Sequence, residues 1–573
     1  MTLARSLALI ALLPAAALAQ QAAAPASSGA GPEGGAPPTR LPLKHAPRPT
    51  VPAITAGDLM TRLYIFADDS MMGREAGTEY NLKGTAYIAG ELRRLGLQPA
   101  GDGGTFFQNV PLVRRSFGEG TRLAVDGQAL TPGTDFLPLP GRGTPRPIDG
   151  ATVVFGGSWG DAAHALTSEQ VAGKLVLFEP AAGSGVATPR VRPGDPLAAA
   201  AAIAIVGLDG LSPRALSFLR QPSISIATAS GSAAAPLPGA LLVSRQAAER
   251  LLGAPLAGAA VGTAGKTVSG ALVYTESPAP ARNVVAVLRG SDPKLAGQYV
   301  AIGAHNDHVG FNHAPVDHDS LHAFNAKAWE AAGRYAGLPP LTPAQRSAIT
   351  VDVAALRKTA PARPDSIANG ADDDGSGSVG VLEIAEWMAR SKQRPKRSVL
   401  FVWHTGEEKG LLGSRYFTDT PTVPRDSIVA QINIDMIGRG SLADTKGGGP
   451  DYLGVVGSRR LSTELGDLVE SVNRSEKRPL AFDYQLDANG HPENIYCRSD
   501  HYSYARYGIP IVFFFTGLHG DYHQVTDEPQ YIDYAHMARI TGFIGDLTRR
   551  VADLDHRPVV DKPKPDPNGV CRQ

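Results

Sequence analysis

Cysteine is nearly absent from this sequence: Cys497 and Cys571 are the only two among 573 residues. So few thiols exclude both a disulfide framework and a thiolate zinc cluster. Any bound metal must therefore be held by nitrogen and oxygen ligands. The two thiols could pair in an oxidising compartment, which would tie the C-terminal residues to the rest of the chain. The sequence gives no distance between them and leaves both states open.

An excess of charge of either sign is also absent, because 55 basic residues balance 55 acidic ones. Nucleic acid and membrane surfaces are therefore not expected as partners. Hydrophobic residues make up 43% of the chain and charged residues 19%, as in soluble globular proteins. The sequence gives no indication of the oligomeric state.

Long apolar runs are lacking as well, since no segment reaches the roughly 18 apolar residues that a membrane-spanning helix needs. The N-terminus has a shorter run, Leu7–Leu13, which follows Arg5 and precedes small residues at Ala17–Ala19. This order predicts a signal peptide over residues 1–19 and export of the mature chain to the periplasm or the medium. An uncleaved anchor is the alternative.

Composition divides the rest of the chain into segments. Residues 20–50 are rich in Ala, Pro and Gly, which predicts a flexible linker. Amphipathic helices are expected within 51–121, the second of them ending at Gly96. Short β-rich runs between Gly, Pro and Ser predict a separate small domain over 122–279. Residues 280–555 alternate strands with helices, and together with 51–121 they predict an α/β domain with a mixed, largely parallel central sheet flanked by helices.

One long insertion interrupts the α/β domain at residues 311–364, and a helix is expected within it over 343–358. A loop of this length inside a compact domain is usually functional or mobile, so a lid over the site is one interpretation. A solvated surface excursion is the other. Residues 556–573 are expected to form a polar tail. The insertion also contains a group of histidines and aspartates: His313, Asp317, His318, Asp319 and His322.

Four apolar runs of the α/β domain each lead to residues that suit a metal ion. The first leads to His305, the second to Glu407 and Glu408, the third to Asp435, and the fourth to a loop with His523. Ligands of open α/β sheets bind beyond the carboxyl ends of parallel strands, so these side chains are expected to meet at one place. The runs cover residues 299–302, 398–403, 429–434 and 511–515.

An acidic loop supplies further carboxylates, because Asp372, Asp373 and Asp374 stand just before an apolar-periodic helix. Two histidines and three carboxylates would suit a pair of zinc ions that share one bridging carboxylate. The sequence has no His-Glu-x-x-His motif, which excludes a single-zinc endopeptidase of that type. A Gly-x-Gly-x-x-Gly string over Gly375–Gly380 follows the acidic loop rather than a strand, so a dinucleotide site is discounted.

The motifs of this region occur in a characteristic order: Gly303–Asp307, Gly370–Asp373 with Ser376–Gly377, Glu407–Ser414, Asn433–Met436, Ser499–His501, and Tyr522–His523. This series resembles the co-catalytic zinc aminopeptidase family, which includes bacterial leucyl aminopeptidases and glutamate carboxypeptidase II. The resemblance covers about Asn283 to Leu554 together with the helical opening. It rests on the order of the motifs, because no single motif is specific.

The resemblance implies two Zn²⁺ ions per chain. His305 and Asp435 would bind one ion, Glu408 and His523 would bind the other, and Asp373 would bridge both. Three neighbouring aspartates compete for the bridging position. Alignment of the flanking Gly-Ala and Ser-Gly residues with the family pattern selects Asp373.

Other residues of these motifs are expected to act around the metals. Glu407 would be the general base that takes a proton from the shared water. Asp307 is expected to fix the ring of the first histidine ligand, although it could be an ordinary surface carboxylate. Tyr496 could be an oxyanion donor or a packing residue. By resemblance, Asp500 and His501 line the substrate side and orient the substrate.

The resemblance implies a peptide substrate and, in first place, an aminopeptidase. A carboxypeptidase or a glutaminyl cyclase on the same fold is the alternative, and Arg415 and Arg498 keep a carboxylate-binding pocket possible. A non-catalytic, receptor-like binding protein is a remote alternative, because the predicted ligands and Glu407 are all retained. The β-rich segment 122–279 resembles the protease-associated domain that accompanies many such exopeptidases.

Overall fold

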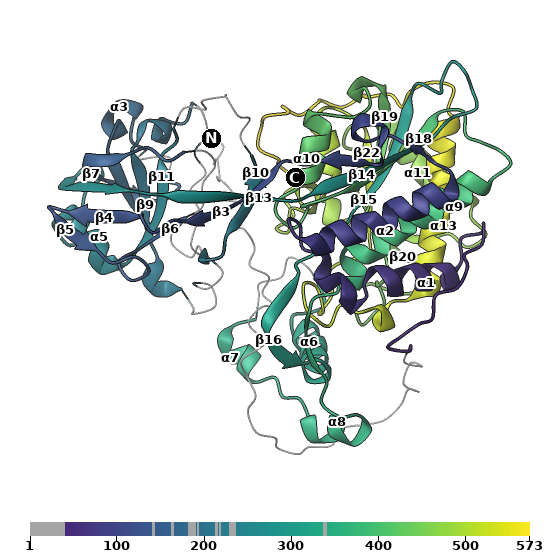
Figure 1. The fold of residues 1–573 in the computed structure, drawn as a ribbon, viewed down its shortest axis with the longest axis horizontal. Helices are drawn as coiled ribbons and strands as arrows, with labels where there is room; N and C mark the ends of the chain where they lie inside the picture. Colours follow the sequence, from purple (N-terminus) through teal and green to yellow (C-terminus); the bar gives the residue numbers. More distant parts are fainter. Residues whose placement is uncertain are drawn as a thin grey trace. The chain divides into compact units, whose positions relative to one another are not determined.

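The computed structural model (Figure 1) describes residues 41–573 except for 140–143, 162–164, 181–190, 192–193, 212–215, 217–218, 228–235 and 336–340. The predicted signal peptide and most of the predicted linker therefore lie outside the described residues. Residues 41–50 contain no helix or strand. The chain forms two compact units: Leu112–Ala279, and a larger unit made of Pro280–Gln573 with the described residues up to Pro111.

A mixed sheet forms the centre of the larger unit, with the strand order β1-β14-β18-β15-β19-β22-β20-β21 and β2 also paired with β14. Strands β18, β15, β19 and β22 are parallel neighbours, whereas β14 and β20 run antiparallel to β18 and β22. The predicted mixed, largely parallel sheet is confirmed. The strands are β1 (Gln98–Pro99), β2 (Phe107–Asn109), β14 (Arg282–Leu288), β15 (Tyr299–His305), β18 (Ser398–His404), β19 (Ile428–Ile434), β20 (Tyr452–Val456), β21 (Ala481–Asp483) and β22 (Ile511–Phe515).

Helices cover both faces of this sheet because alternate side chains of each strand point to opposite sides. In β14, Val284 and Ala286 belong to a core shared with α1, α2, α9, α11 and α13, whereas Val285 and Val287 belong to a second core shared with α10 and α12. The helices are α1 (Ala56–Phe66), α2 (Glu79–Leu95), α9 (Gly377–Arg390), α10 (Leu412–Asp419), α11 (Thr463–Ser475), α12 (His501–Ala505) and α13 (Tyr534–Asp553).

The two helices expected in the opening segment are present as α1 and α2. The hydroxyl of Thr55 accepts a hydrogen bond from the backbone N–H of Asp58, and Thr78 caps α2 through Asn81 in the same way. Helix α2 ends at Gly96, whose φ of 75° lies in the left-handed region that glycine adopts without strain.

The smaller unit contains an eight-stranded sheet with the order β5-β4-β12-β7-β8-β9-β11-β6 and a three-stranded sheet with the order β10-β3-β13. It begins at Leu112, ten residues before the predicted position 122, because β3 pairs with β10 and β13. Its elements are β3 (Leu112–Phe117), β4 (Arg122–Val125), β5 (Gln128–Leu130), β6 (Phe136–Leu139), β7 (Ile148–Ser158), α3 (Ser168–Val171), β8 (Leu175–Glu179), β9 (Ala202–Val206), β10 (Ser223–Ile226), β11 (Gly239–Val243), α5 (Arg245–Leu252), β12 (Ala264–Ala271) and β13 (Tyr274–Ala279).

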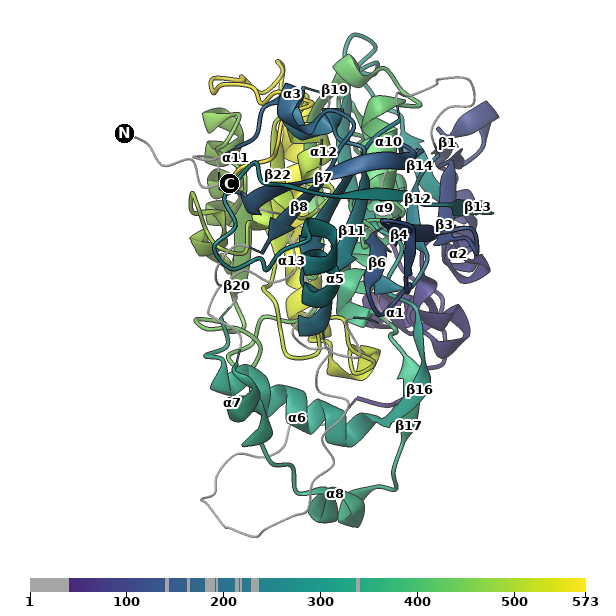
Figure 2. The same cartoon turned by 90° about the vertical axis from the view of Figure 1, so that its left-hand side faces the viewer.

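The insertion over 311–364 contains more regular structure than its sequence predicted, and its helices gather beyond one end of the central sheet (Figure 2). The helix expected over 343–358 is divided into two short helices. His322 contacts Asp521 at 3.1 Å, and Asn325 donates to Thr526 at 3.1 Å, so the longest helix, α6, contacts the loop that carries His523. The elements are β16 (Phe311–Asp317), α6 (His318–Ala331), α7 (Pro343–Ser347), α8 (Val353–Thr359) and β17 (Pro364–Ile367).

The C-terminal residues are held to the body of the larger unit. Cys497 and Cys571 form a disulfide across a sequence separation of 74, which the sequence had left open. The side chain of Gln573 accepts a hydrogen bond from the backbone of Tyr496 at 3.0 Å and donates to the backbone oxygen of Ala488 at 3.0 Å. None of the helices among the described residues is both long and apolar enough to cross a membrane.

Candidate metal centre

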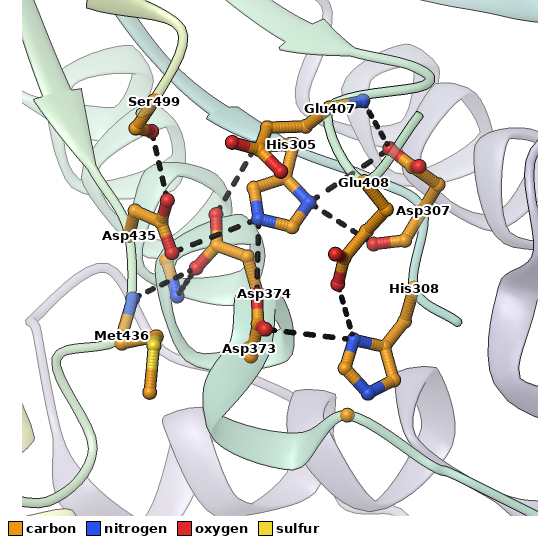
Figure 3. A network of polar contacts seen from close by, with 12 residues as sticks. His305, Asp307, His308, Asp373, Asp374, Glu407, Glu408, Asp435, Met436 and Ser499 are labelled. Atoms are coloured by element: carbon orange, nitrogen blue, oxygen red, sulfur yellow. Dashed lines mark hydrogen bonds and ion pairs between the residues drawn. The ribbon is translucent and has the colours of Figure 1, made fainter. Parts of the chain in front are cut away.

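The four parallel strands bring their predicted polar residues to one end of the sheet, and Figure 3 labels those that follow the first three strands: His305, Glu407, Glu408 and Asp435. Strand β15 ends at His305, and the chain reaches Glu407 and Glu408 just after β18. Asp435 directly follows β19, and the loop after β22 carries His523. Because these strands run in the same direction, their carboxyl ends meet, as the sequence predicted.

The three neighbouring aspartates of the acidic loop have different surroundings. Asp372 accepts a hydrogen bond from the backbone of Gly438 at 2.7 Å, and Asp374 accepts one from the backbone of His305 at 3.0 Å. Both carboxylates thus join the loop to other segments of the backbone. Asp373 instead contacts histidine side chains through both oxygens, which is the position expected of a bridging carboxylate.

A first group of donor atoms lies around the imidazole of His305. Its Nε2 is 3.1 Å from Asp373 Oδ1 and 3.6 Å from Asp435 Oδ1. Its Nδ1 lies 3.0 Å from the backbone oxygen of Asp307, while the carboxylate of Asp307 is 3.8 Å away. A hydrogen bond to this backbone oxygen requires a proton on Nδ1, which leaves Nε2 free to bind a metal.

A second group lies on the other oxygen of Asp373. His523 Nε2 is 2.9 Å from Asp373 Oδ2 and 2.9 Å from Glu408 Oε2. The group has a further member, because His308 Nδ1 is 2.9 Å from Glu408 Oε1. Sequence reasoning missed His308. The available signal was its place, one residue after Asp307 in the same strand-end loop.

Several donor atoms of these two groups lack a hydrogen-bond partner although they are buried. Within each group the possible ligand atoms all lie within 4.8 Å of one another. Buried polar atoms without a partner are costly, and an ion within each group would satisfy them. The residues therefore fit two metal ions that share Asp373. These atoms are His305 Nε2, His308 Nδ1, Glu408 Oε1 and His523 Nε2.

The electrostatics of the site favour positive charge between the carboxylates. Burial alone would raise the pKa of Asp373, but His305 and His523 outweigh it and hold this pKa well below its usual range. Burial lowers the pKa of His523, but Glu408 and Asp373 raise it to about 10. These shifts follow from the close approach of imidazoles and carboxylates, an arrangement that favours a cation between the carboxylates.

Glu407 lies beside the two donor groups (Figure 3). Burial raises its pKa well above the usual range, and the nearby carboxylates of Glu408, Asp435 and Asp500 add to this effect. Its backbone N–H donates to Asp307 Oδ1 at 3.1 Å. A carboxyl group with a raised pKa is the kind of group that can act as a general base or acid.

The predicted substrate-orienting residues lie outside both donor groups. Tyr496 is packed in the hydrophobic core, with the guanidinium of Arg460 over its ring at 4.5 Å. His501 contacts the backbone oxygen of Tyr496 at 2.7 Å, and burial lowers its pKa to about 3, so it is neutral. Asp500 is buried, 3.4 Å from His404 Nδ1. Their predicted role toward a substrate stays a prediction.

Comparisons with known proteins found relatives that match part of this chain. The leupeptin-inactivating enzyme 1 of Streptomyces exfoliatus is 28% identical over 29% of this chain and 33% of its own length. Leucine aminopeptidase 1 of Coccidioides posadasii (strain C735) is 35% identical over 26% of this chain and 36% of its own length. The chain thus spans about one third of the length of these curated relatives. An aminopeptidase structure from Aneurinibacillus sp. strain AM-1 is 16% identical, with 89% of this chain and 97% of that chain covered and a TM-score of 0.48.

A family profile matches more of the sequence than these relatives do. The match extends over residues 283–548, and all five predicted metal ligands and Glu407 lie within it. This profile is that of peptidase family M28, to which residues 283–548 are similar.

Proposed function

We propose that this chain is an exported two-zinc aminopeptidase that removes N-terminal residues from peptides. One observation carries the proposal: two groups of buried, unpartnered donor atoms share the carboxylate of Asp373, and Glu407 lies beside them. In this proposal one ion is held by His305, Asp373 and Asp435. The other ion is held by Asp373 together with Glu408 and His523.

The chemistry of the site follows from its residues. Zinc bound between these donors would supply a water of lowered pKa and polarise the scissile carbonyl. Glu407 accepts the proton of the attacking water and returns it to the leaving amine. Asp307 holds the backbone of Glu407 at 3.1 Å, so it acts as a positioning residue for the base as well as for the loop of His305.

Removal of N-terminal rather than C-terminal residues is supported by the names of the curated relatives, among which leucine aminopeptidases predominate. Export is supported by the disulfide, because such bonds form and persist in oxidising compartments. The β-rich unit over Leu112–Ala279 is proposed to be a protease-associated domain.

The test is hydrolysis of a panel of amino-acid anilides and dipeptides by the purified protein, with bound metal counted in parallel. We expect release of unblocked N-terminal residues, about two metal ions per chain, and loss of activity in chelated protein. Activity should return when zinc is added back.

Two other outcomes would replace the proposal. Cleavage restricted to free C-termini would establish a carboxypeptidase instead. Bound metal without hydrolysis of any peptide would favour a glutaminyl cyclase, which N-terminal glutamine peptides would then reveal, or a binding protein if these also stayed intact.

A further inference from the structure

His308 lies in the second donor group although no motif of the sequence assigned it there. Its side chain is fully buried, and Nδ1 is 2.9 Å from Glu408 Oε1 and 3.8 Å from Asp373 Oδ2. The rings of His308 and His523 are 5.5 Å apart and inclined at 69°. The two imidazoles therefore approach the same pair of carboxylates from different directions.

A hydrogen bond to Glu408 does not account for this position. His308 Nδ1 and Glu408 Oε1 are close enough for one, yet neither atom has a hydrogen-bond partner among the described residues. Both atoms belong to one cluster with Asp373 and His523, in which the four ligand atoms all lie within 4.8 Å of one another. Buried polar atoms gathered this closely without hydrogen-bond partners are the arrangement that a cation satisfies.

The surrounding backbone fixes the imidazole of His308. A Cβ atom at Gly370 would lie 2.4 Å from His308 Cγ, so only glycine leaves room for the ring. Gly370 also has a φ of 55°, which glycine adopts without strain. The backbone N–H of His308 points to the oxygen of Arg74 at 3.4 Å. The surrounding backbone therefore fixes the position of the imidazole ring.

We propose that His308 is a fourth protein ligand of the ion held by Asp373, Glu408 and His523. The proposal rests on the two-ion function above and makes the two sites unequal. The second site has four protein donors and is closed, as structural zinc sites are. The first site, with His305, Asp373 and Asp435, has three donors and keeps a position for water, as catalytic zinc sites do.

Unequal sites predict that the ion at His308 is held more tightly than its neighbour. Zinc should leave the dialysed protein in two steps when a competing chelator is titrated in, and the later step belongs to the closed site. His308→Ala removes one donor and should weaken zinc binding at the tighter site about 100-fold or more, so that the two steps merge. Loss of a residue that only hydrogen-bonds to a metal ligand would weaken zinc binding by about 10- to 100-fold.

The ligand itself is identified with protein loaded with ¹¹³Cd²⁺, because the cadmium resonance depends on the number of nitrogen ligands. We expect two resonances in the unaltered chain, and only one of them should shift in His308→Ala. His308→Leu, which refills the space beside Gly370, gives the same shift if the alanine variant folds poorly. His536→Gln is the matched control, because His536 is buried but contacts the backbone oxygen of Arg439 through Nδ1, and it should move neither resonance.

The outcomes separate this inference from the proposed function. Two resonances that both keep their positions in the His308 variants would overturn the fourth ligand and leave the two-ion proposal intact. Asp373→Asn should shift both resonances or release both ions. If the unaltered chain binds one cadmium ion or none, the two-ion proposal fails and the unequal pair of sites proposed for His308 fails with it.

Discussion

Glu407 is the residue at which the proposed chemistry is most directly testable. Glu407→Gln keeps the shape of the side chain but removes its basicity, so we expect kcat to fall by about 10² to 10⁴-fold. The metal content should stay at the unaltered value because Glu407 belongs to neither donor group. Steady-state kinetics with metal analysis on the same sample provide the measurement.

The matched control is Glu330→Gln, since Glu330 is exposed on α6 and pairs with Arg334 in an i, i+4 contact. This variant should keep its turnover. Nearly normal kcat in Glu407→Gln would remove the base from the mechanism, whereas a parallel loss of metal would show that the residue supports the site rather than the proton transfer.

A second residue-scale prediction concerns pH and lies away from the metals. Glu383 accepts a hydrogen bond from Arg62 at 2.9 Å, and both side chains are buried. Burial raises the pKa of Glu383 from 4.5 to about 7, and Arg62 only partly offsets this. Between these values the folded chain binds a proton that the unfolded chain has released, so stability falls as pH rises.

Glutamine imitates the protonated carboxyl group, so Glu383→Gln should have little effect near pH 5. Near pH 8 the variant should be more stable than the unaltered chain, by on the order of 1 to 3 kcal/mol. Thermal unfolding at the two pH values tests this. At each pH the stability of the unaltered chain is subtracted from that of the variant. A difference that is smaller at pH 8 than at pH 5 would refute the prediction.

Glu386, on the same helix, is expected to have the opposite effect on the pH dependence of stability. Burial would raise its pKa, but hydrogen bonds from Arg94 and Thr50 and the charge of Arg62 lower it instead. Its charged form is therefore the stabilising one above its unfolded pKa. Glu386→Gln should cost stability at neutral pH, and the loss should shrink as the solution is acidified.

The residues of the candidate site could be predicted only in part from the sequence. Asp373 could be chosen among three aspartates because it stands at a fixed place between glycine and serine motifs. His308 could not be found, because its role depends on which way its ring points after the strand ends. For Tyr496 the sequence left an oxyanion donor and a packing residue open, because its contacts in the core and with Arg460 depend on long-range packing.

At the scale of elements, the acidic loop is held in place by Arg74. This guanidinium is fully buried and donates to the backbone oxygens of Phe66, Asn369 and Gly370 at 2.9, 2.7 and 2.9 Å. Burial lowers its pKa to about 10, so it stays charged at neutral pH. The turn before α2 and the loop that carries Asp373 are thereby joined.

Arg74→Met should loosen this connection, because it removes hydrogen bonds from three buried carbonyl groups, of which only that of Gly370 keeps another among the described residues, from the backbone of Gly375. Each carbonyl group left unpaired costs about 1 to 3 kcal/mol. We expect a Tm lower by several degrees and weaker binding of both zinc ions, measured by calorimetry and by equilibrium dialysis. Arg459→Met is the control, since Arg459 is largely exposed and pairs with Asp467, where little stability is expected to be lost. Unchanged zinc affinity in Arg74→Met would show that the loop holds its shape without the arginine.

The elements themselves differ in how well the sequence predicted them. The four strands that carry the site were found because each is an apolar run of β-forming residues that ends in polar ones. Helix α6 was not found, because His318–Ala331 is polar on most of its surface and lacks a clear apolar period. It is stabilised by contacts with the loop that carries His523, which no local pattern reveals.

At the scale of the whole molecule, the disulfide between Cys497 and Cys571 joins residues 74 positions apart. Closing a loop of this length in the unfolded chain should stabilise the fold by about 2 to 4 kcal/mol. Cys571→Ser should therefore lower the Tm by several degrees in calorimetry. Reductant should lower the Tm of the unaltered chain to that of the variant and leave the variant unchanged; equal shifts in both would mean that the reductant acts elsewhere.

The path of the chain into the smaller unit has a consequence for how the molecule could have arisen. Within that unit, the first and last residues are register partners, since Leu112 on β3 pairs with Ala279 on β13. On the other side, Asn109 on β2 pairs with Arg282 on β14. Strands β2 and β14 are therefore the arms of an antiparallel hairpin that has the smaller unit in place of a short turn. A single insertion at the tip of one turn would suffice to add the whole unit, and a single deletion there would leave every strand of the central sheet in the chain.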